Sequence, residues 1–408
     1  MRTGGSMDSD LLLYNGTVLG ETQTIANGYV LVRDGRICRI GSGVPEQEAA
    51  EKIDVKGLTI SPGFIDMHTH GIGNVDFMES SIEDMEQALS EYARYGATRV
   101  VPTTISNTID ATISQMKQIR KLRENSPLGA MIPGTHMEGP WLSARCRGGH
   151  ALEYLKSPTA EDVRRVIGEV GDIIITLTYA PEVQNAVWLT EQLCYHGIIP
   201  SLGHTEATFE QAEQAILAGA RHVTHMYDTT LGYKENPEEA LVMMPGMETA
   251  VLMDDHVSIE LIGCPVHVPR PFFRFINKIK PRDKKVLVTD SLVGTGLPEQ
   301  TRLTYKDGRR LYVEQGVLRM IDEDPAVNGN LTGSAVTINV ALSRLKEYAE
   351  LTIRDAVSWV SLNPATTLGI SKQTGSIAIG KYADIVVMDE SCNVKMTLLK
   401  GNRVFKAE

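Results

Sequence analysis

The sequence predicts an α/β fold, a (β/α)₈ barrel of the TIM type joined to a small β domain that both ends of the chain supply. Two observations lead to this prediction. Through the middle of the chain, short apolar and β-branched runs alternate with stretches patterned as helices. At both ends the sequence instead reads as short strands separated by tight turns.

The composition is that of an ordinary globular protein. Of the 408 residues, 42% are hydrophobic and 22% charged, so the chain can bury a sizeable core. Its net charge of −11 argues against a nucleic-acid partner, which would require an excess of clustered Lys and Arg. No run approaches the roughly 18 apolar residues of a membrane span, and the first residues lack the apolar segment of a signal peptide. Five scattered cysteines without a CxxC pair indicate free thiols, and together these features predict a cytoplasmic protein with no membrane partner.

The two ends of the chain are expected to fold together into the small β domain. Residues 11–60 and 373–408 contain β-branched runs broken by dipeptides typical of turns, namely Asn15-Gly16, Asp34-Gly35 and Gly401-Asn402. Residues 1–10, which include a second methionine at Met7, are expected to be disordered or an artificially added end.

Residues 61–372 are expected to form the barrel. Helices are predicted over 81–96, 109–125, 157–171 and 205–220. The predicted N-caps are Ser81, Thr159 and Thr208, each with an acidic residue two places on. Gly96 and Gly219 are predicted to end helices. The eight predicted strands include the apolar runs 58–66, 98–105, 129–136, 173–180, 198–203, 221–225, 250–262 and 285–290.

Imidazole and carboxylate side chains stand at the ends of five of these strands. Because the carboxyl ends of barrel strands open onto one face, where active sites are built, these side chains are expected to converge. They are His68 and His70 at the first strand, His136 and Glu138 at the third, His204 at the fifth, His225 at the sixth and Asp290 at the eighth.

The chemistry of these side chains is that of a metal site. Neutral imidazole and carboxylate are, besides thiolate, the usual ligands of zinc, and an open catalytic site uses about three of them. A divalent ion lowers the pKa of water from about 15.7 to near 7 and polarises a carbonyl oxygen. Asp290, on a separate strand, could take the proton of that water and pass it to a leaving nitrogen.

Each of these residues alone also has a structural explanation. A histidine at a strand end is more often hydrogen-bonded than metal-bound, and an HxH pair follows from the alternation of side chains along a strand. Glu138 and Asp290 could each cap a helix. Five strand ends that each supply a ligand or a proton carrier favour the functional interpretation. Four histidines are assigned structural roles, namely His136, His196, His222 and His256. His150 and His267 are considered below.

Nine segments together resemble a known family. They are SPGFIDMHTHG, HMEGPWLS, RGGH, SLGHTEAT, THMYD, VTDS, NLTGS, NPA and GSIAIGKYADIVV, in this order. The chain resembles the amidohydrolase superfamily and, within it, most closely the N-acetylglucosamine-6-phosphate deacetylases, from Leu11 to the C-terminus. The resemblance implies a (β/α)₈ barrel with a small β-sandwich domain made from both termini, in agreement with the pattern above.

The resemblance also implies a site and a reaction. Glu138, His204 and His225 match the family's main metal ligands, and His68 and His70 match positions that hold a second metal in some members. One ion is therefore expected, zinc before other divalent metals, with a second left open at His68 and His70. The implied reaction hydrolyses the acetamide of an N-acetyl amino sugar and releases acetate and the free amine.

Further residues are assigned to catalysis and to the substrate by the same resemblance. Asp290 matches the general base and acid, His150 a histidine near the reacting acetyl group, and His267 a histidine that holds the sugar or its carbonyl. Trp141, beside the Glu138 loop, could stack on a sugar or pack in the core. Members of the family are commonly dimers, so a homodimer is an open expectation.

The chain departs from the family where the sugar phosphate would bind. Tyr227 and Asp228 stand where an aromatic-Asn-Ala pattern is usual, and the family's phosphate-binding arginine has no counterpart beyond Lys234. Three arginines elsewhere in the chain are alternative phosphate partners: Arg145, Arg147 and Arg270. Cys264-Pro265 replaces the usual Asp-Gly before His267. These departures leave three alternatives open: an unphosphorylated N-acetylhexosamine, a different N-acyl or cyclic amide, or a metal-binding relative without catalytic activity.

Overall fold

The structure is a computed structural model that describes residues 11–43, 49–235, 238–264, 266–305, 308–325 and 327–407, with the side chains of 233–235 left out. The expectation for residues 1–10 falls outside the described residues. No helix among the described residues is long and apolar enough to cross a membrane.

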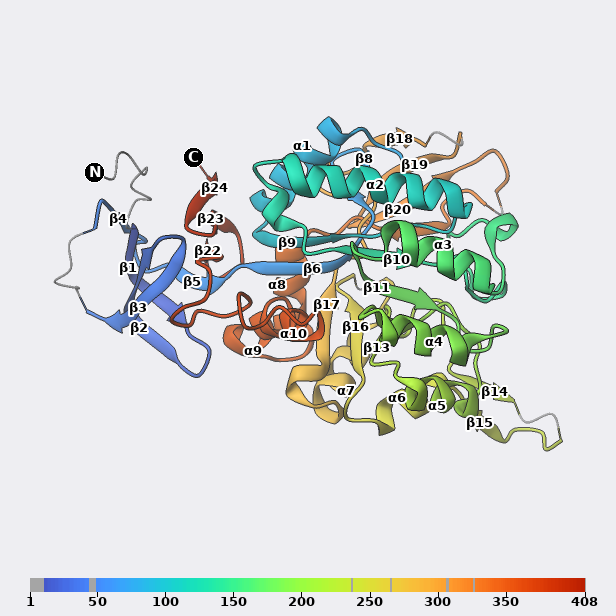
Figure 1. Ribbon diagram of the computed structural model, residues 1–408. Helices are drawn as coiled ribbons and strands as arrows, with labels where there is room; N and C mark the ends of the chain where they lie inside the picture. Colours follow the sequence, from blue (N-terminus) through green and yellow to red (C-terminus); the bar gives the residue numbers. More distant parts are fainter. Residues whose placement is uncertain are drawn as a thin grey trace.

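Eight parallel strands form the barrel, with helices packed around it (Figure 1). β6 pairs with β9, and six further strands pair in the order β10, β11, β12, β13, β16, β17. Two parallel bridges join these groups at both seams, Thr103 with His136 and Thr69 with Ser291. The predicted fold class is therefore confirmed. The strands are β6 (Phe64–Thr69), β9 (Ala97–Pro102), β10 (Thr135–Glu138), β11 (Ile174–Tyr179), β12 (Ile199–Leu202), β13 (His222–Val223), β16 (Ser258–Ile262) and β17 (Lys285–Val288).

The helices that surround the barrel begin where the sequence predicts. The hydroxyls of Ser81, Thr159 and Thr208 each accept a hydrogen bond from the backbone N–H three residues on, which satisfies a donor that the helix leaves unpaired. Gly96 and Gly219 follow helix ends with positive φ, as predicted. The helices are α1 (Ile82–Arg94), α2 (Ile109–Asn125), α3 (Ala160–Val170), α4 (Ala186–Tyr195), α5 (Phe209–Ala218), α6 (Met247–Met253), α7 (Arg270–Ile279), α8 (Ile338–Tyr348), α9 (Ile353–Trp359) and α10 (Leu362–Thr367).

Strands from both chain ends form one separate sheet at the side of the barrel (Figure 1). Its order is β24-β23-β22-β5-β1-β2-β3, and β4 pairs with β1. It has an apolar core of its own, in which Val18 and Ile60 of the first segment pack with Ile385 and Leu398 of the second. The strands are β1 (Leu11–Leu19), β2 (Thr24–Arg33), β3 (Arg36–Ser42), β4 (Glu51–Asp54), β5 (Thr59–Pro62), β22 (Ile385–Met388), β23 (Val394–Leu399) and β24 (Asn402–Lys406).

Three of the predicted strands are wrong in extent. Only the end of the run 129–136 belongs to β10, because Gly129–Met131 form a 3₁₀ helix. The run 58–66 contains two strands, because β5 belongs to the terminal sheet and only β6 enters the barrel. Gly63 separates them, and a Cβ there would lie 2.3 Å from Thr98 Oγ1, so only glycine allows this approach. In the run 250–262, the first residues belong to α6, which buries Met247, Ala250 and Val251 at helical spacing.

Three small antiparallel units are inserted between barrel elements, and the sequence pattern did not indicate them. One is a four-stranded sheet between β17 and α8, with a small apolar core of its own that includes Leu311, Val313 and Leu318. The others are two hairpins. The strands are β7 (Gly71–Ile72) with β8 (Val75–Asp76), β14 (Tyr233–Glu235) with β15 (Met243–Pro245), and the sheet β18 (Arg302–Thr304), β19 (Arg310–Glu314), β20 (Val317–Ile321) and β21 (Leu331–Ser334).

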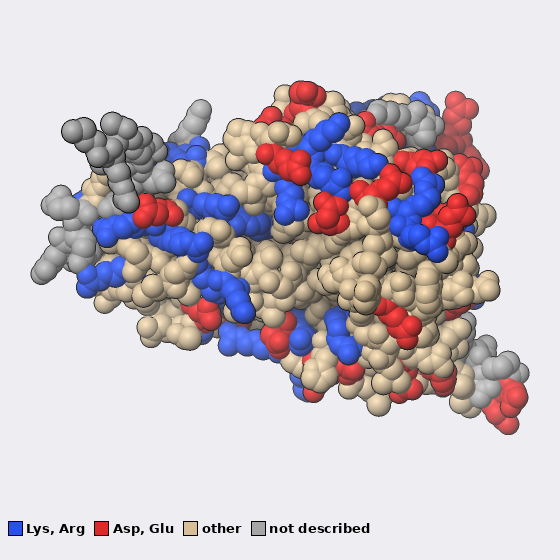
Figure 2. Space-filling view, viewed as in Figure 1, with Lys and Arg blue, Asp and Glu red and all other residues tan. Residues whose placement is uncertain are grey.

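Acidic and basic side chains are interspersed over α2 and α3 on the face shown in Figure 2. Ion pairs link the two helices there, between Lys117 and Glu169 and between Arg165 and Asp110. Lys117 and Arg165 are therefore paired with acids, and the positive charge over these two helices is broken up by negative charge.

A buried ion pair ties the barrel to the terminal sheet. Arg99 of β9 and Asp384, which precedes β22, approach to 2.7 Å with side chains 6% and 1% exposed. Asp384 also accepts hydrogen bonds from the Thr374 hydroxyl and the Lys400 backbone N–H, and its carbonyl accepts one from Gly63 N–H. Because Asp384 is almost fully enclosed, its charge depends on these partners.

We predict that Arg99→Met lowers the free energy of unfolding by about 3 kcal/mol, because it leaves a buried carboxylate without its cation. Arg282→Met is the matched control, since its pair with Asp355 is exposed and is worth less than about 1 kcal/mol. Urea denaturation of both variants measures the difference. Equal, small losses would show that the Arg99 pair does not stabilise the fold.

Candidate metal centre

The ends of the barrel strands open into a cavity of about 610 Å³. Eight of the sequence-predicted site residues line it, and they come from segments far apart in the chain. These residues are His70, Glu138, His150, His204, His225, Asp228, His267 and Asp290. The convergence predicted from the strand ends is therefore present, and the residues lie at the carboxyl face of the barrel.

Glu138 lies at the centre of the group. Its Oε1 is 3.2 Å from His204 Nε2 and 3.0 Å from His225 Nε2, and the two nitrogens are 3.1 Å apart. A tetrahedral zinc with bonds of about 2.1 Å places its ligand atoms roughly 3.4 Å apart. The three donors are thus spaced almost as they would be around one ion.

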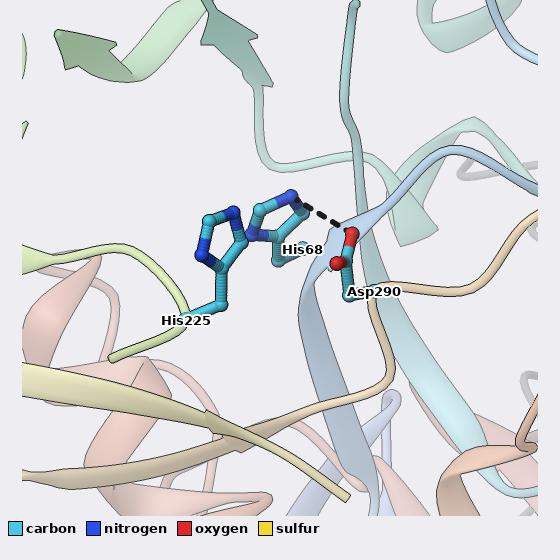
Figure 3. A group of neighbouring side chains, drawn as sticks. All are labelled: His68, His225 and Asp290. Atoms are coloured by element: carbon cyan, nitrogen blue, oxygen red, sulfur yellow. Dashed lines mark ion pairs between the residues drawn. The ribbon is translucent and has the colours of Figure 1, made fainter. Parts of the chain in front are cut away.

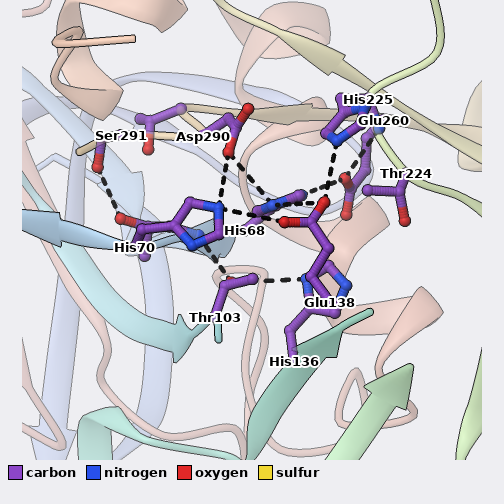
Figure 4. Close-up of polar contacts among 12 residues, drawn as sticks. His68, His70, Thr103, His136, Glu138, Thr224, His225, Glu260, Asp290 and Ser291 are labelled. Carbon is purple, nitrogen blue, oxygen red and sulfur yellow. Dashed lines mark hydrogen bonds and ion pairs between the residues drawn. The ribbon is translucent and has the colours of Figure 1, made fainter. Parts of the chain in front are cut away.

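A second group adjoins the first on the side of β6 and β17 (Figures 3 and 4). Asp290 Oδ1 lies 3.2 Å from both His68 Nε2 and His70 Nε2. The other oxygen of Glu138, Oε2, is 3.3 Å from His70 Nε2. Ligand atoms of His68, His70 and Glu138 all lie within 4.8 Å of one another. Glu138 therefore faces both groups, one with each oxygen.

Hydrogen bonds behind His204 and His68 point the Nε2 atom of each ring at this centre. His204 Nδ1 lies 2.9 Å from the Cys146 carbonyl, which can only accept, so Nδ1 carries the proton and Nε2 of the neutral ring has a lone pair. That lone pair faces a carboxylate oxygen. His68 Nε2 is buried and makes no hydrogen bond of good geometry, although Asp290 is 3.2 Å away. Lone pairs and carboxylates converging in this way can hold a cation between them, and the donor set fits zinc.

The pKa values of the group show the same demand for positive charge. Burial raises the pKa of Glu138, but His68 and the hydrogen-bonded imidazoles outweigh burial and hold this pKa well below its usual value. Burial lowers the pKa of His225, but the hydrogen bond to Glu138 and the charges of Glu138 and Asp290 together outweigh burial and raise the pKa to about 9. Without a cation, protons on the imidazoles compensate the buried carboxylates.

His150 has a fixed tautomer. The Ser106 backbone N–H donates to His150 Nδ1 at 3.0 Å, so the proton of the neutral ring is on Nε2. Burial is the main reason that the pKa of His150 is lowered to about 4, so the ring is neutral at pH 7. Its Nε2 lies 3.4 Å from Glu138 Oε2. The ring can therefore donate one hydrogen bond beside the metal centre.

The structure separates the predicted substrate-binding residues into two sets. Asp228 and His267 line the cavity. Trp141 does not, because it is fully buried in the hydrophobic core, which is the second of the two alternatives given for it. Tyr227 is also absent from the cavity wall, and its ring stacks on Phe272 with centroids 4.0 Å apart.

Of the cations considered as phosphate partners, Arg147 lines the cavity, and its Nη1 donates to the His150 carbonyl at 3.1 Å. Arg145 pairs instead with Glu206, and Arg270 with Glu347. Lys234 lies in β14, where side chains are outside the described residues. Arg309 also lines the cavity and was not anticipated.

A layer of polar residues beneath the centre was missed or assigned only structural roles. Glu260 contacts His68 and His222, and His136 Nε2 lies 2.6 Å from the Thr178 hydroxyl. A single acid within the apolar run of β16 was the available signal for Glu260, but the sequence does not show which histidines it meets.

Comparison with known proteins matches residues 59–404 to the amidohydrolase family. The N-acetylglucosamine-6-phosphate deacetylase of Bacillus subtilis (strain 168) is 28% identical over 403 residues, or 98% of each chain. The enzyme of the same name from Bos taurus is 28% identical and covers 88% of this chain and 87% of its own.

Solved structures of N-acetylglucosamine-6-phosphate deacetylases are also similar. That from Pasteurella multocida has a TM-score of 0.86 and 27% identity, and a mutant from Mycobacterium smegmatis in complex with N-acetyl-D-glucosamine-6-phosphate has 0.85 and 27%. Both matches cover 98% of this chain and 100% of the other. The family match includes all eight barrel strands and every residue of the metal centre, and the chain therefore belongs to the amidohydrolase family.

Proposed function

We propose that this protein is a metal-dependent deacetylase that hydrolyses the acetamide of an N-acetylated amino sugar, with N-acetylglucosamine-6-phosphate as the leading substrate. The observation that carries the proposal is the spacing of Glu138, His204 and His225, 3.0–3.2 Å apart beside Asp290 in the cavity. Relatives that match nearly the whole chain are named for this activity, which supports the choice of substrate class.

Glu138, His204 and His225 would hold the first ion, for which zinc suits the donor set. His68 and His70 would hold a second one if two are bound. When bound, a divalent ion supplies a Lewis acid that polarises the acetamide carbonyl and lowers the pKa of water to near 7.

Asp290 is placed to move the proton. Burial opposes its ionisation, but His68 and His70 outweigh burial and lower its pKa, so the carboxylate is charged at neutral pH. Its side chain is 17% exposed, whereas that of Glu138 is 2% exposed, so it can reach the cavity. It accepts a proton from the attacking water and returns it to the amine as the carbonyl–nitrogen bond breaks, and acetate and the amino sugar leave.

His150 and His267 act on the substrate. His150 donates its Nε2–H to the carbonyl oxygen, where negative charge develops during attack. His267 lines the same cavity with its buried Nδ1 unpaired, and it holds a hydroxyl or the carbonyl of the sugar.

The cavity gives mixed support to a phosphate on the substrate. Arg147 and Arg309 line it and can attract an anion. Asp228 lines it as well and would repel one. Phosphorylated and unphosphorylated sugars must therefore be compared directly.

We predict that the zinc-loaded protein releases acetate from N-acetylglucosamine-6-phosphate with a kcat/KM about tenfold or more above that for N-acetylglucosamine, since a charge-assisted contact is worth at least 1.4 kcal/mol. Asp290→Asn should keep its zinc and slow acetate release by roughly 10²–10⁴-fold, because it removes the proton carrier.

In the wild-type protein, preference for the neutral sugar would reassign the substrate. If metal-loaded protein released no acetate from either sugar, the deacetylase proposal would fall in favour of another amide.

We predict that Glu138→Gln lowers zinc bound per chain by about one equivalent, because a neutral amide replaces the charged ligand that faces both imidazole groups. Metal content after dialysis against a defined free-zinc buffer measures this loss. Glu182→Gln is the control, because that carboxylate contacts Thr205 and the Glu206 backbone instead. Unchanged zinc in Glu138→Gln would place the ion elsewhere.

We predict that Asp228→Asn lowers the KM for N-acetylglucosamine-6-phosphate by about fivefold or more, because one repulsion of about 1 kcal/mol between charges is removed. The KM for N-acetylglucosamine should stay within about twofold, since that substrate carries no charge for Asp228 to repel. An equal change for both substrates would mean that Asp228 does not face the phosphate.

A further inference from the structure

Glu260 is a buried acid that the proposed mechanism does not use. It lies in the middle of β16, whose five residues are all buried, and its own exposure is 0%. A carboxylate in such a place costs several kcal/mol unless hydrogen bonds or charges compensate it. The partners of the Glu260 carboxylate must therefore compensate its charge.

Among the described residues, the partners of its carboxylate are His68 and His225 of the metal centre and the neighbouring His222, and Figure 4 labels the first two. Glu260 Oε2 lies 3.0 Å from His68 Nδ1 and accepts a hydrogen bond of 3.2 Å from the His225 backbone N–H. Oε1 lies 2.9 Å from His222 Nε2. One oxygen thus connects the ends of β6 and β13, which carry two of the candidate ligands.

The contact with His68 decides which nitrogen faces the centre. An ionised carboxylate only accepts, so His68 Nδ1 carries a proton and the ring presents Nε2 to Glu138 and Asp290. The negative charge behind the ring also makes Nε2 a stronger donor toward a cation. The contact with the His225 N–H holds the backbone of a ligand whose φ is +28°, an uncommon value for a side chain other than glycine.

We propose that Glu260 is a positioning residue of the metal centre, which orients His68 and fixes the backbone of His225 without touching the ion or the substrate. This inference rests on the metal site of the proposed function. According to the inference, zinc binding requires the charged carboxylate of Glu260 below the ligands, in addition to the ligands themselves.

The test is zinc affinity, measured by competition with a chromophoric chelator and without turnover. Glu260→Gln keeps the size of the side chain but cannot accept all three hydrogen bonds. We expect a Kd for zinc about 10–100-fold higher than that of the wild type. The absorption spectrum of the cobalt-substituted variant should also change, because the coordination geometry changes with the ring of His68.

Asp384→Asn is the matched control, because Asp384 is also enclosed and accepts several hydrogen bonds, but it contacts Gly63 before the start of β6, whereas His68 lies near the other end of that strand. It should lower thermal stability and leave the zinc Kd unchanged. A double variant with His68→Asn should show non-additive losses of zinc affinity, since Glu260 acts through that ring.

Wild-type zinc affinity in Glu260→Gln would overturn the inference. If that variant does not fold, the same titration on Glu260→Asp decides, since its retracted charge no longer reaches His68 and should weaken binding. An unchanged Kd there would also overturn the inference. A wild-type protein that binds no zinc would instead refute the metal site of the proposed function, so the two failures are distinguishable.

Discussion

The arrangement of the site depends on the burial of several carboxylates and imidazoles against one another. Glu138 is 2% exposed and faces imidazole nitrogens with both oxygens. In such a place a negative charge is costly unless a cation or protons compensate it. The lone pair of His204 points into the same space. The barrel mouth therefore needs compensating positive charge, which a bound cation or protonated imidazoles can supply.

The short parallel strands of the barrel bring these polar groups together at one end of the sheet. β13 has only two residues in the ladder and β10 only four, so the chain leaves the sheet just where His225 and Glu138 stand. Below them the barrel is filled by apolar residues and hydroxyls, including the Thr178, Ser201 and Thr224 chain, which satisfies its own hydrogen bonds. These packed residues support the ligands from below, and the inserted sheet β18–β21 forms part of the cavity wall.

Much of the fold and of the candidate site could be predicted from the sequence, because both follow local rules. Helix caps such as Ser81 act within one turn, and the ligands follow strand ends that parallel topology brings together. The predictions that failed or stayed open concern features that depend on contacts between distant segments. Whether 58–66 is one strand or two depends on pairing with β22, and the environment of Trp141 depends on the core around it. Glu260 was missed because an acid in an apolar strand does not show its partners.

The direct passage from β5 into β6 has a consequence for biosynthesis. β5 lies between β1 and β22, and β22 is made only near the end of translation. β6, which carries His68 and His70, starts one residue after β5 ends. The sheet that anchors this strand is thus complete only after the other seven barrel strands have left the ribosome. His68 and His70 are the first histidines to be synthesised, yet the strand before them gains its partner β22 only after every other residue of the centre has been made.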